Sequence, residues 1–111
     1  YSNRARENIV AKVKHVVLLK FKPGVSEEQA QAAIEAVRGL EGVIGGIEDF
    51  LAGTYSSPEG LNQGYTHGFI MTFESAEARN GYLDHPEHER VKNGFFPLLD
   101  GAIAFDFEVS G

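Results

Sequence analysis

The side chains of this sequence that can change charge near neutral pH are its four histidines. His15 stands in an alternating apolar run near the N-terminus, whereas His67, His85 and His88 follow later, the last two close to Tyr82. Imidazole is the only ordinary side chain whose unperturbed pKa lies near neutrality, so it can take up or release a proton at physiological pH. A neighbouring phenol adds a hydrogen-bond donor. These residue types predict acid–base chemistry at a site built around them.

Tyr82 and His88 are the pair whose positions best suit catalysis. Pro86 favours the first turn of a helix, which places His88 near the positive end of that helix, where an imidazolium is disfavoured. We therefore expect a neutral His88 that accepts a proton and a Tyr82 that donates to a developing enolate oxygen. This arrangement predicts proton abstraction next to a carbonyl group. The alternative is that both side chains only satisfy hydrogen bonds at the edge of the core.

A metal site is the other chemistry that the histidines suggest. His85 and His88 are three residues apart, a spacing at which two imidazoles on one helix can bind one metal ion. The carboxylates that would add oxygen ligands are Asp84, Glu87 and Glu89. However, His85 precedes Pro86 and is expected to lie outside the regular helix, and no second histidine pair is present. We therefore predict no metal site and expect Asp84 to cap the helix.

The bulk properties exclude several classes of function. The length of 111 residues suits one domain, which we predict at residues 12–110, after a flexible arm at residues 1–11 without the apolar stretch of a signal peptide. The formal net charge of −6 argues against nucleic acid as a partner. The chain has no cysteine, which excludes thiolate chemistry and fits the cytoplasmic location that we expect. No apolar run reaches the roughly 20 residues that cross a bilayer, so no membrane partner is predicted.

The spacing of apolar residues predicts four strands and three helices. The strands are expected at residues 12–22, 47–55, 65–73 and 102–109, because apolar side chains alternate there. One helix begins after Ser26, which forms a capping box with Gln29; a second spans residues 75–83, and a third begins at Pro86 and ends at Gly101. This order of elements is the split βαβ arrangement of a ferredoxin-like fold, an α+β class with a four-stranded antiparallel sheet.

The two faces of the predicted sheet have different expected roles. One face and the helices should enclose a hydrophobic pocket for a small apolar ligand, with walls formed by His15, Val17, Leu19, Ala33, Val37, Phe50, His67, Phe69, Val91 and Phe95. Within it, His15 and His67 are expected to bond to each other or to cap the pocket floor. The other face would expose an apolar patch too large to leave bare, formed by Val16, Leu18, Ile70, Ile103, Phe105 and Phe107. The same face of a second copy is the simplest cover, so we predict a two-fold homodimer.

Five segments of the sequence resemble the stress-responsive A/B barrel (Dabb) family. They are Val13–Lys22, Gly64–His67, Thr72–Ser75, Tyr82–His88 and Phe105–Phe107. The combination of a strand histidine, Tyr-Thr-His and His-Pro-x-His is more specific than any one of these motifs alone. The resemblance spans residues 12–109 and implies a dimeric α+β barrel.

The resemblance also implies a chemistry. One enzyme of the family cyclises a linear polyketide thioester by aldol condensation without a metal or organic cofactor. Its catalytic tyrosine and histidine, six residues apart, match Tyr82 and His88, and its pocket-entry strand histidine matches His15. Positions that are aromatic on its first helix match Ala33 and Val37. The resemblance therefore implies the same chemical groups in a differently shaped pocket.

Three functions fit these observations. The first is a cofactor-free cyclase or lyase acting on a polyketide-like carbonyl compound, with His88 as base and Tyr82 as oxyanion donor. The second is a non-catalytic stress-response or ligand-binding oligomer, and the third is a cofactor-free monooxygenase. An open apolar pocket that reaches His88 would favour an enzyme, whereas a sealed core would exclude one.

Overall fold

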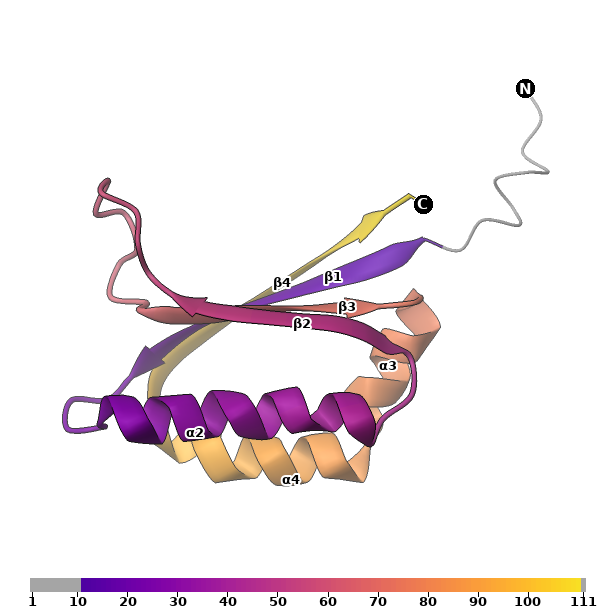
Figure 1. Ribbon diagram of the computed structural model, residues 1–111, viewed down its shortest axis with the longest axis horizontal. Coiled ribbons are helices and arrows are strands. Elements are labelled where there is room, and N and C mark those ends of the chain that lie inside the picture. The colour runs from indigo at the N-terminus through magenta and orange to yellow at the C-terminus, as the bar shows by residue number, and fades with distance from the viewer. Residues whose placement is uncertain (1–10, 111) are drawn as a thin grey trace.

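The computed structural model describes residues 11–110, so the predicted N-terminal arm lies outside the described residues except for Ala11. An antiparallel four-stranded sheet in the order β2-β3-β1-β4 forms one layer, and helices form the other (Figure 1). The strands are β1 (Lys12–Phe21), β2 (Ile47–Thr54), β3 (His67–Phe73) and β4 (Leu99–Val109). The helices are α2 (Glu27–Arg38), α3 (Ala76–Asp84) and α4 (Pro86–Phe95), with 3₁₀ turns at Gly39–Gly42 and Phe96–Leu98. The predicted α+β ferredoxin-like fold is confirmed.

Side-chain caps set the starts of the helices. Ser26 and Gln29 form the predicted capping box, with the Gln29 amide N 3.1 Å from Ser26 Oγ and the Ser26 amide N 2.9 Å from Gln29 Oε1. The prediction that Asp84 caps α4 is wrong. Asp84 still belongs to α3, and the extended residue His85 is the cap, with its Nδ1 accepting a hydrogen bond from the Glu87 amide at 3.0 Å. His85 therefore has a structural role as the N-cap of α4.

The end of α4 and the start of β4 differ from the sequence prediction. Regular helix stops at Phe95, not near Gly101, because Pro97 has no amide hydrogen and its ring would clash with the carbonyl four residues earlier. Leu99 is already part of β4, three residues before the predicted start at Ala102. The β3 strand begins two residues later than expected, since the Tyr65 amide bonds to the Asn62 carbonyl in a turn.

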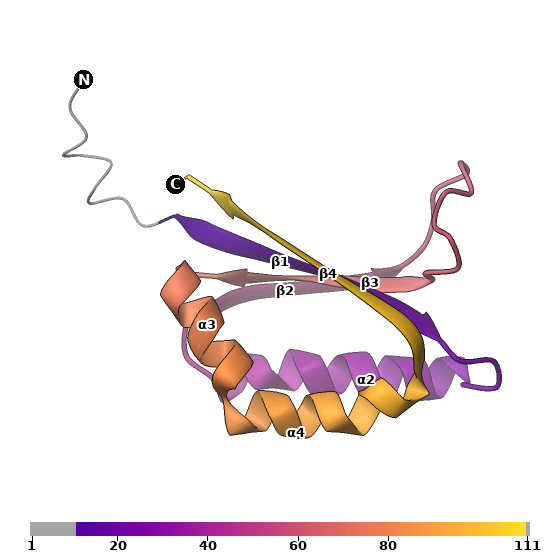
Figure 2. The ribbon, with the colours of Figure 1, turned by 180° about the vertical axis from the view of Figure 1, so that it is seen from behind.

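The core lies between the sheet and the helix layer. Alternate residues of β1 are buried there, as the period of two predicted, and they meet the apolar stripe of α2. Both views place α2, α3 and α4 on the same side of the sheet (Figures 1 and 2). The most completely buried large side chains are Val13, Leu19, Ile34, Leu40, Met71 and Phe73.

The other face of the sheet is uncovered and apolar. The β2–β3 connection at residues 55–66 rises on this side, away from the helices (Figure 2). Side chains of this face that expose between 39% and 64% of their surface are Leu18, Leu51, Ile70, Ile103, Phe105 and Phe107. Leu51 is an addition to the predicted patch, and Val16 is half-buried within it. Within residues 11–110, no helix combines the length and the apolar character needed to cross a membrane.

Candidate active site

A cavity of about 240 Å³ lies between the helix-facing side of the sheet and the helix layer. Strands β1, β3 and β4 form one wall, and α2, α3 and α4 with the turn after it form the other. The volume is slightly below the range of about 300–1,000 Å³ that is usual for small-molecule sites. The wall residues are His15, Val17, Leu19, Val37, Leu40, Phe69, Tyr82, Leu83, His88, Val91, Lys92, Phe95, Phe96, Ala102 and Ala104. Tyr82 and His88 thus share one cavity with His15.

Tyr82 is placed by the last turn of α3 and is almost fully buried. Its ring packs against Phe73, with centroids 5.0 Å apart, and against His88, with centroids 4.4 Å apart. Burial raises the pKa of the phenol to about 12, so the hydroxyl keeps its proton at physiological pH. Among the described residues this hydroxyl has no hydrogen-bond partner. No unpaired side-chain oxygen there is fully enclosed, so the hydroxyl oxygen keeps some accessible surface. A ligand in the cavity can therefore receive its hydrogen bond.

His88 lies in the first turn of α4, three residues after the His85 cap. Its Nδ1 is 3.2 Å from the Leu83 carbonyl oxygen, which can only accept, so Nδ1 carries the proton and Nε2 keeps the lone pair. Partial burial lowers the pKa of the imidazole below its usual 6.5, and the Lys92 ammonium lowers it further, although the Leu83 carbonyl acts in the opposite direction. The ring is therefore neutral at neutral pH and able to accept a proton.

His15 belongs to a second polar group at the same cavity. Its Nδ1 lies 2.6 Å from Oδ1 of Asp106, whose Oδ2 is 2.8 Å from an Arg79 guanidinium nitrogen. Burial works to raise the pKa of Asp106, but the hydrogen bonds from His15 and Arg79 outweigh it and hold that pKa below the usual 3.8. The ionised carboxylate fixes the His15 ring with Nδ1–H toward Asp106. The His15 ring centroid is 6.1 Å from that of Tyr82.

Asp106 is the polar residue that the sequence analysis did not assign to the site. It faces His15 directly in the antiparallel pairing of β1 with β4, 91 residues away in the chain. The signal in the sequence is a carboxylate among Ala102 and Ala104, on the face of β4 that turns toward the helices. Asp106 is not itself a wall residue but holds one, His15. The wall residues without a sequence prediction include Leu40, Leu83, Lys92 and Phe96.

Three residues predicted as pocket walls do not line this cavity. Ala33 lies on a shallow groove between α2 and α4, because it is turned toward the neighbouring helix rather than the sheet. Phe50 is buried in the core, where its ring stacks on Phe69 at 5.1 Å. His67 lies at the start of β3, near the N-terminal end of α2.

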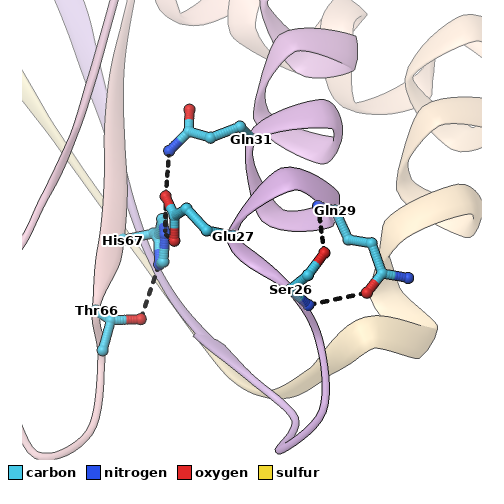
Figure 3. A network of polar contacts seen from close by, with 6 residues as sticks. All are labelled: Ser26, Glu27, Gln29, Gln31, Thr66 and His67. Atoms are coloured by element: carbon cyan, nitrogen blue, oxygen red, sulfur yellow. Dashed lines mark hydrogen bonds and ion pairs between the residues drawn. The ribbon is translucent and has the colours of Figure 1, made fainter.

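The predicted bond between His15 and His67 is wrong. In the β1–β3 register His15 faces Met71, while His67 faces Leu19. Four residues of strand separate the two positions, roughly 13 Å at the usual rise. His67 Nε2 instead lies 3.0 Å from Glu27 Oε1 and its Nδ1 2.7 Å from Thr66 Oγ1 (Figure 3). His67 thus connects the sheet to α2 outside the cavity.

The carboxylates near the cavity do not assemble into a ligand set. Glu87 bonds to Arg90 and Glu89 to Lys92, each three residues further along α4. Within residues 11–110, no three histidine or carboxylate side chains lie close enough together to hold a metal ion. The groups that the cavity does present are two imidazoles, one phenol and one ammonium on otherwise apolar walls.

One protein family and two individual proteins match most of this chain. The model of the family described as Stress responsive A/B Barrel Domain matches residues 13–109. The stress-response A/B barrel domain-containing protein HS1 of Arabidopsis thaliana is 41% identical over 96 residues, covering 86% of this chain and 88% of that protein. Olivetolic acid cyclase of Cannabis sativa is 30% identical over 95 residues, covering 86% of this chain and 94% of the enzyme.

Solved structures agree with the fold. The crystal structure of At3g17210 from Arabidopsis thaliana has a TM-score of 0.84 and 39% identity, covering 89% of this chain and 96% of that one. A dimeric ferredoxin-like protein from Jannaschia sp. CCS1 has a TM-score of 0.78 and 25% identity, covering 88% and 99% of the two chains. The Jannaschia protein is described as a dimer.

Proposed function

The chain belongs to the stress-responsive A/B barrel domain family, and on that premise we propose that it is a homodimer whose cavity abstracts a proton next to the carbonyl group of an apolar compound. His88 is the base and Tyr82 is the oxyanion donor. The reaction class is that of a cyclase or lyase. The relative that supports this class is olivetolic acid cyclase, which is similar over most of both chains.

One observation carries the proposal, namely that a neutral imidazole and a protonated phenol meet in one cavity. The two rings are 4.4 Å apart, and both line the cavity of about 240 Å³. The lowered pKa of His88 provides a base, and the raised pKa of Tyr82 provides a donor that does not ionise. A base and a donor in opposite protonation states at the same pH are what enolate chemistry needs.

The proposed steps balance with these two side chains. Nε2 of His88 takes a proton from the carbon next to a carbonyl, and the electron pair of that C–H bond forms an enolate. The enolate carbon then attacks a second carbonyl of the same molecule, forming a carbon–carbon bond and an alkoxide. Tyr82 donates a hydrogen bond to the oxygen that carries the charge, and the imidazolium returns its proton to the alkoxide. No electrons are gained or lost, so the steps require no oxidant.

The homodimer is proposed from the uncovered sheet face. Leu18, Ile103 and Phe105 lie side by side on β1 and β4 and expose 39%, 43% and 64% of their surfaces. Such an apolar patch is stabilised by a partner surface. A second copy related by a two-fold axis presents the same residues, so one patch covers the other. The dimeric neighbour from Jannaschia supports this assembly. The predicted cytoplasmic location stays a prediction.

A second candidate function is ligand binding without turnover. Tyr82 exposes only 2% of its surface, and its ring is packed between Phe73 and His88. A phenol held in this way can act as a wall of a binding site rather than as a donor in a reaction. Both functions use the same cavity, and they differ only in whether His88 removes a proton.

Proton abstraction can be measured directly with 4-phenylbutan-2-one in D₂O, by following exchange of its α-protons by NMR. We expect the protein to accelerate exchange and His88→Gln to reduce the enzymatic rate by about 100-fold or more. Tyr82→Phe should reduce it by about 10- to 100-fold. The matched controls are His67→Gln and Tyr65→Phe, which change the same residue types outside the cavity and should retain the rate. A wild-type rate equal to that of His88→Gln would overturn the catalytic proposal and leave ligand binding.

A further inference from the structure

Lys92 is the only wall residue of the cavity that carries a permanent charge, among the residues that the structure describes. The other walls are apolar apart from the phenol and the two imidazoles, and the lowered pKa keeps His88 neutral. The protein as a whole has a formal net charge of −6. Lys92 is therefore the permanent charge that these walls present, and a negatively charged ligand group is the partner that suits it.

The position of Lys92 is at the mouth of the cavity rather than at its floor. It follows His88 by one turn of α4, so both side chains lie on the same helix face. Its side chain exposes 35% of its surface, and its Nζ lies 5.6 Å from the ring centre of Phe96. Phe96 and Leu83, which also line the cavity, are exposed by 49% and 42%. The mouth therefore combines one ammonium with two accessible apolar side chains.

The Lys92 ammonium retains unused hydrogen-bonding capacity. Within residues 11–110 its single ion-pair partner is Glu89, three residues earlier on α4, with Nζ 2.8 Å from Oε1. An ammonium has three hydrogens to donate, so a second acceptor can bind alongside Glu89 or in its place. Glu89 is not a wall residue. It therefore competes for the ammonium without filling the cavity.

From this arrangement we propose, on the basis of the proposed function, that the substrate is an apolar keto acid whose carboxylate binds Lys92 at the mouth. The apolar body fills the cavity, and the ketone lies deeper, beside Tyr82 and His88. A single ammonium without a second cation among the described walls suits a singly charged carboxylate better than a phosphate. Lys92 is then a specificity residue and takes no part in proton transfer.

Two probes of the same size test the charge preference, 4-oxo-4-phenylbutanoate and its uncharged primary amide. Binding is measured by NMR titration of the His88 and Tyr82 ring signals. We expect the wild-type protein to bind the acid about five- to tenfold more tightly than the amide, an effect that weakens in high salt. Lys92→Met should abolish this difference, because binding of the acid should then weaken to that of the amide. Glu89→Gln should increase the difference, because it removes the competitor.

The control for the change in net charge is Lys22→Met, which removes an exposed lysine that does not line the cavity. This variant should keep the preference for the acid. Equal binding of acid and amide by the wild-type protein, both perturbing His88, would overturn the role of Lys92 and leave the proposed function standing. A preference that survives in Lys92→Met would also overturn it. Failure of both probes to perturb the ring signals would count against the cavity as the binding site and thus against both proposals.

Discussion

His15 and Asp106 face each other across β1 and β4, with Nδ1 of the imidazole 2.6 Å from Oδ1 of the carboxylate. The carboxylate also accepts from Arg79 at 2.8 Å, so both of its oxygens are bound. Three chain segments, β1, α3 and β4, are therefore joined by one partly buried carboxylate. The contact determines which nitrogen of His15 carries a proton and holds the ring against the cavity wall.

Asp106→Asn is expected to destabilise the protein by about 1–3 kcal/mol at pH 7. The hydrogen bonds from His15 and Arg79 would then go to a neutral amide, or be lost, instead of going to a charged carboxylate. The folded-state pKa of Asp106 is lowered. The stabilisation is therefore present above the unfolded-state value of about 3.9 and is lost as the pH falls through the folded-state value. Chemical denaturation at pH 7 and pH 3 measures this difference, which should shrink at the lower pH. Asp100→Asn, on an exposed residue of β4, should change the stability by less than about 0.5 kcal/mol. An equal effect of the two variants at pH 7 would contradict the assignment.

Tyr82→Phe should separate stability from activity. The phenol hydroxyl has no hydrogen-bond partner among the described residues, so its removal leaves no buried group unpaired, and the ring contacts with Phe73 and His88 remain. We expect the free energy of unfolding to change by less than about 0.5 kcal/mol while α-proton exchange falls. Denaturation and exchange measured on one preparation test the two quantities together. A large loss of stability with retained exchange would mean that the hydroxyl is structural.

Hydrophobic periodicity in the sequence was sufficient to predict the fold. The alternation in β1 placed His15, Val17 and Leu19 on the buried face and Val16 and Leu18 on the other, as observed. The Ser26–Gln29 box correctly predicted the start of α2. These features are local, since each is set by neighbours within a few residues. The same alternation indicated the apolar outer face on which the dimer proposal depends.

The parts of the site that sequence reasoning missed depend on distant pairing. Asp106 meets His15 only because β4 pairs with β1 in one register, and a shift of one residue would turn it to the other face. His67 shares a strand face with Phe69, which predicts a place in the cavity, but its position along the strand brings it near α2 instead. The position of His85 before Pro86 correctly predicts that it lies outside the regular helix, but its role as the cap depends on a backbone angle that sequence spacing does not specify.

Phe105→Glu should convert the proposed dimer to monomers. Phe105 is the most exposed apolar residue of the predicted patch, at 64%, and a charge there would face the same charge of the second copy at the two-fold interface. Sedimentation velocity at micromolar concentration measures the change in mass. Val43→Glu is the matched control, since Val43 is exposed by 58% but follows the 3₁₀ turn after α2, away from the open sheet face. A wild-type protein that sediments as a monomer would refute the dimer.

The pKa of His88 should respond in opposite directions to its two charged neighbours on α4. Burial lowers this pKa below 6.5, the Lys92 ammonium lowers it further, and the Glu89 carboxylate raises it. Lys92→Met should therefore raise the pKa and Glu89→Gln should lower it, as measured by NMR titration of the imidazole Cε1 proton.

The lowered pKa of His88 also sets a pH dependence. As the pH falls below 6.5, His88 is protonated in the unfolded chain before it is protonated in the folded protein, so its contribution to stability declines as the pH falls. Exchange catalysed by neutral His88 should decline over the lower range in which the folded imidazole becomes protonated, and in Lys92→Met this decline should shift to higher pH. A decline in exchange at the same pH in all three proteins would show that another group is the base, with His15 the first candidate because it lines the same cavity.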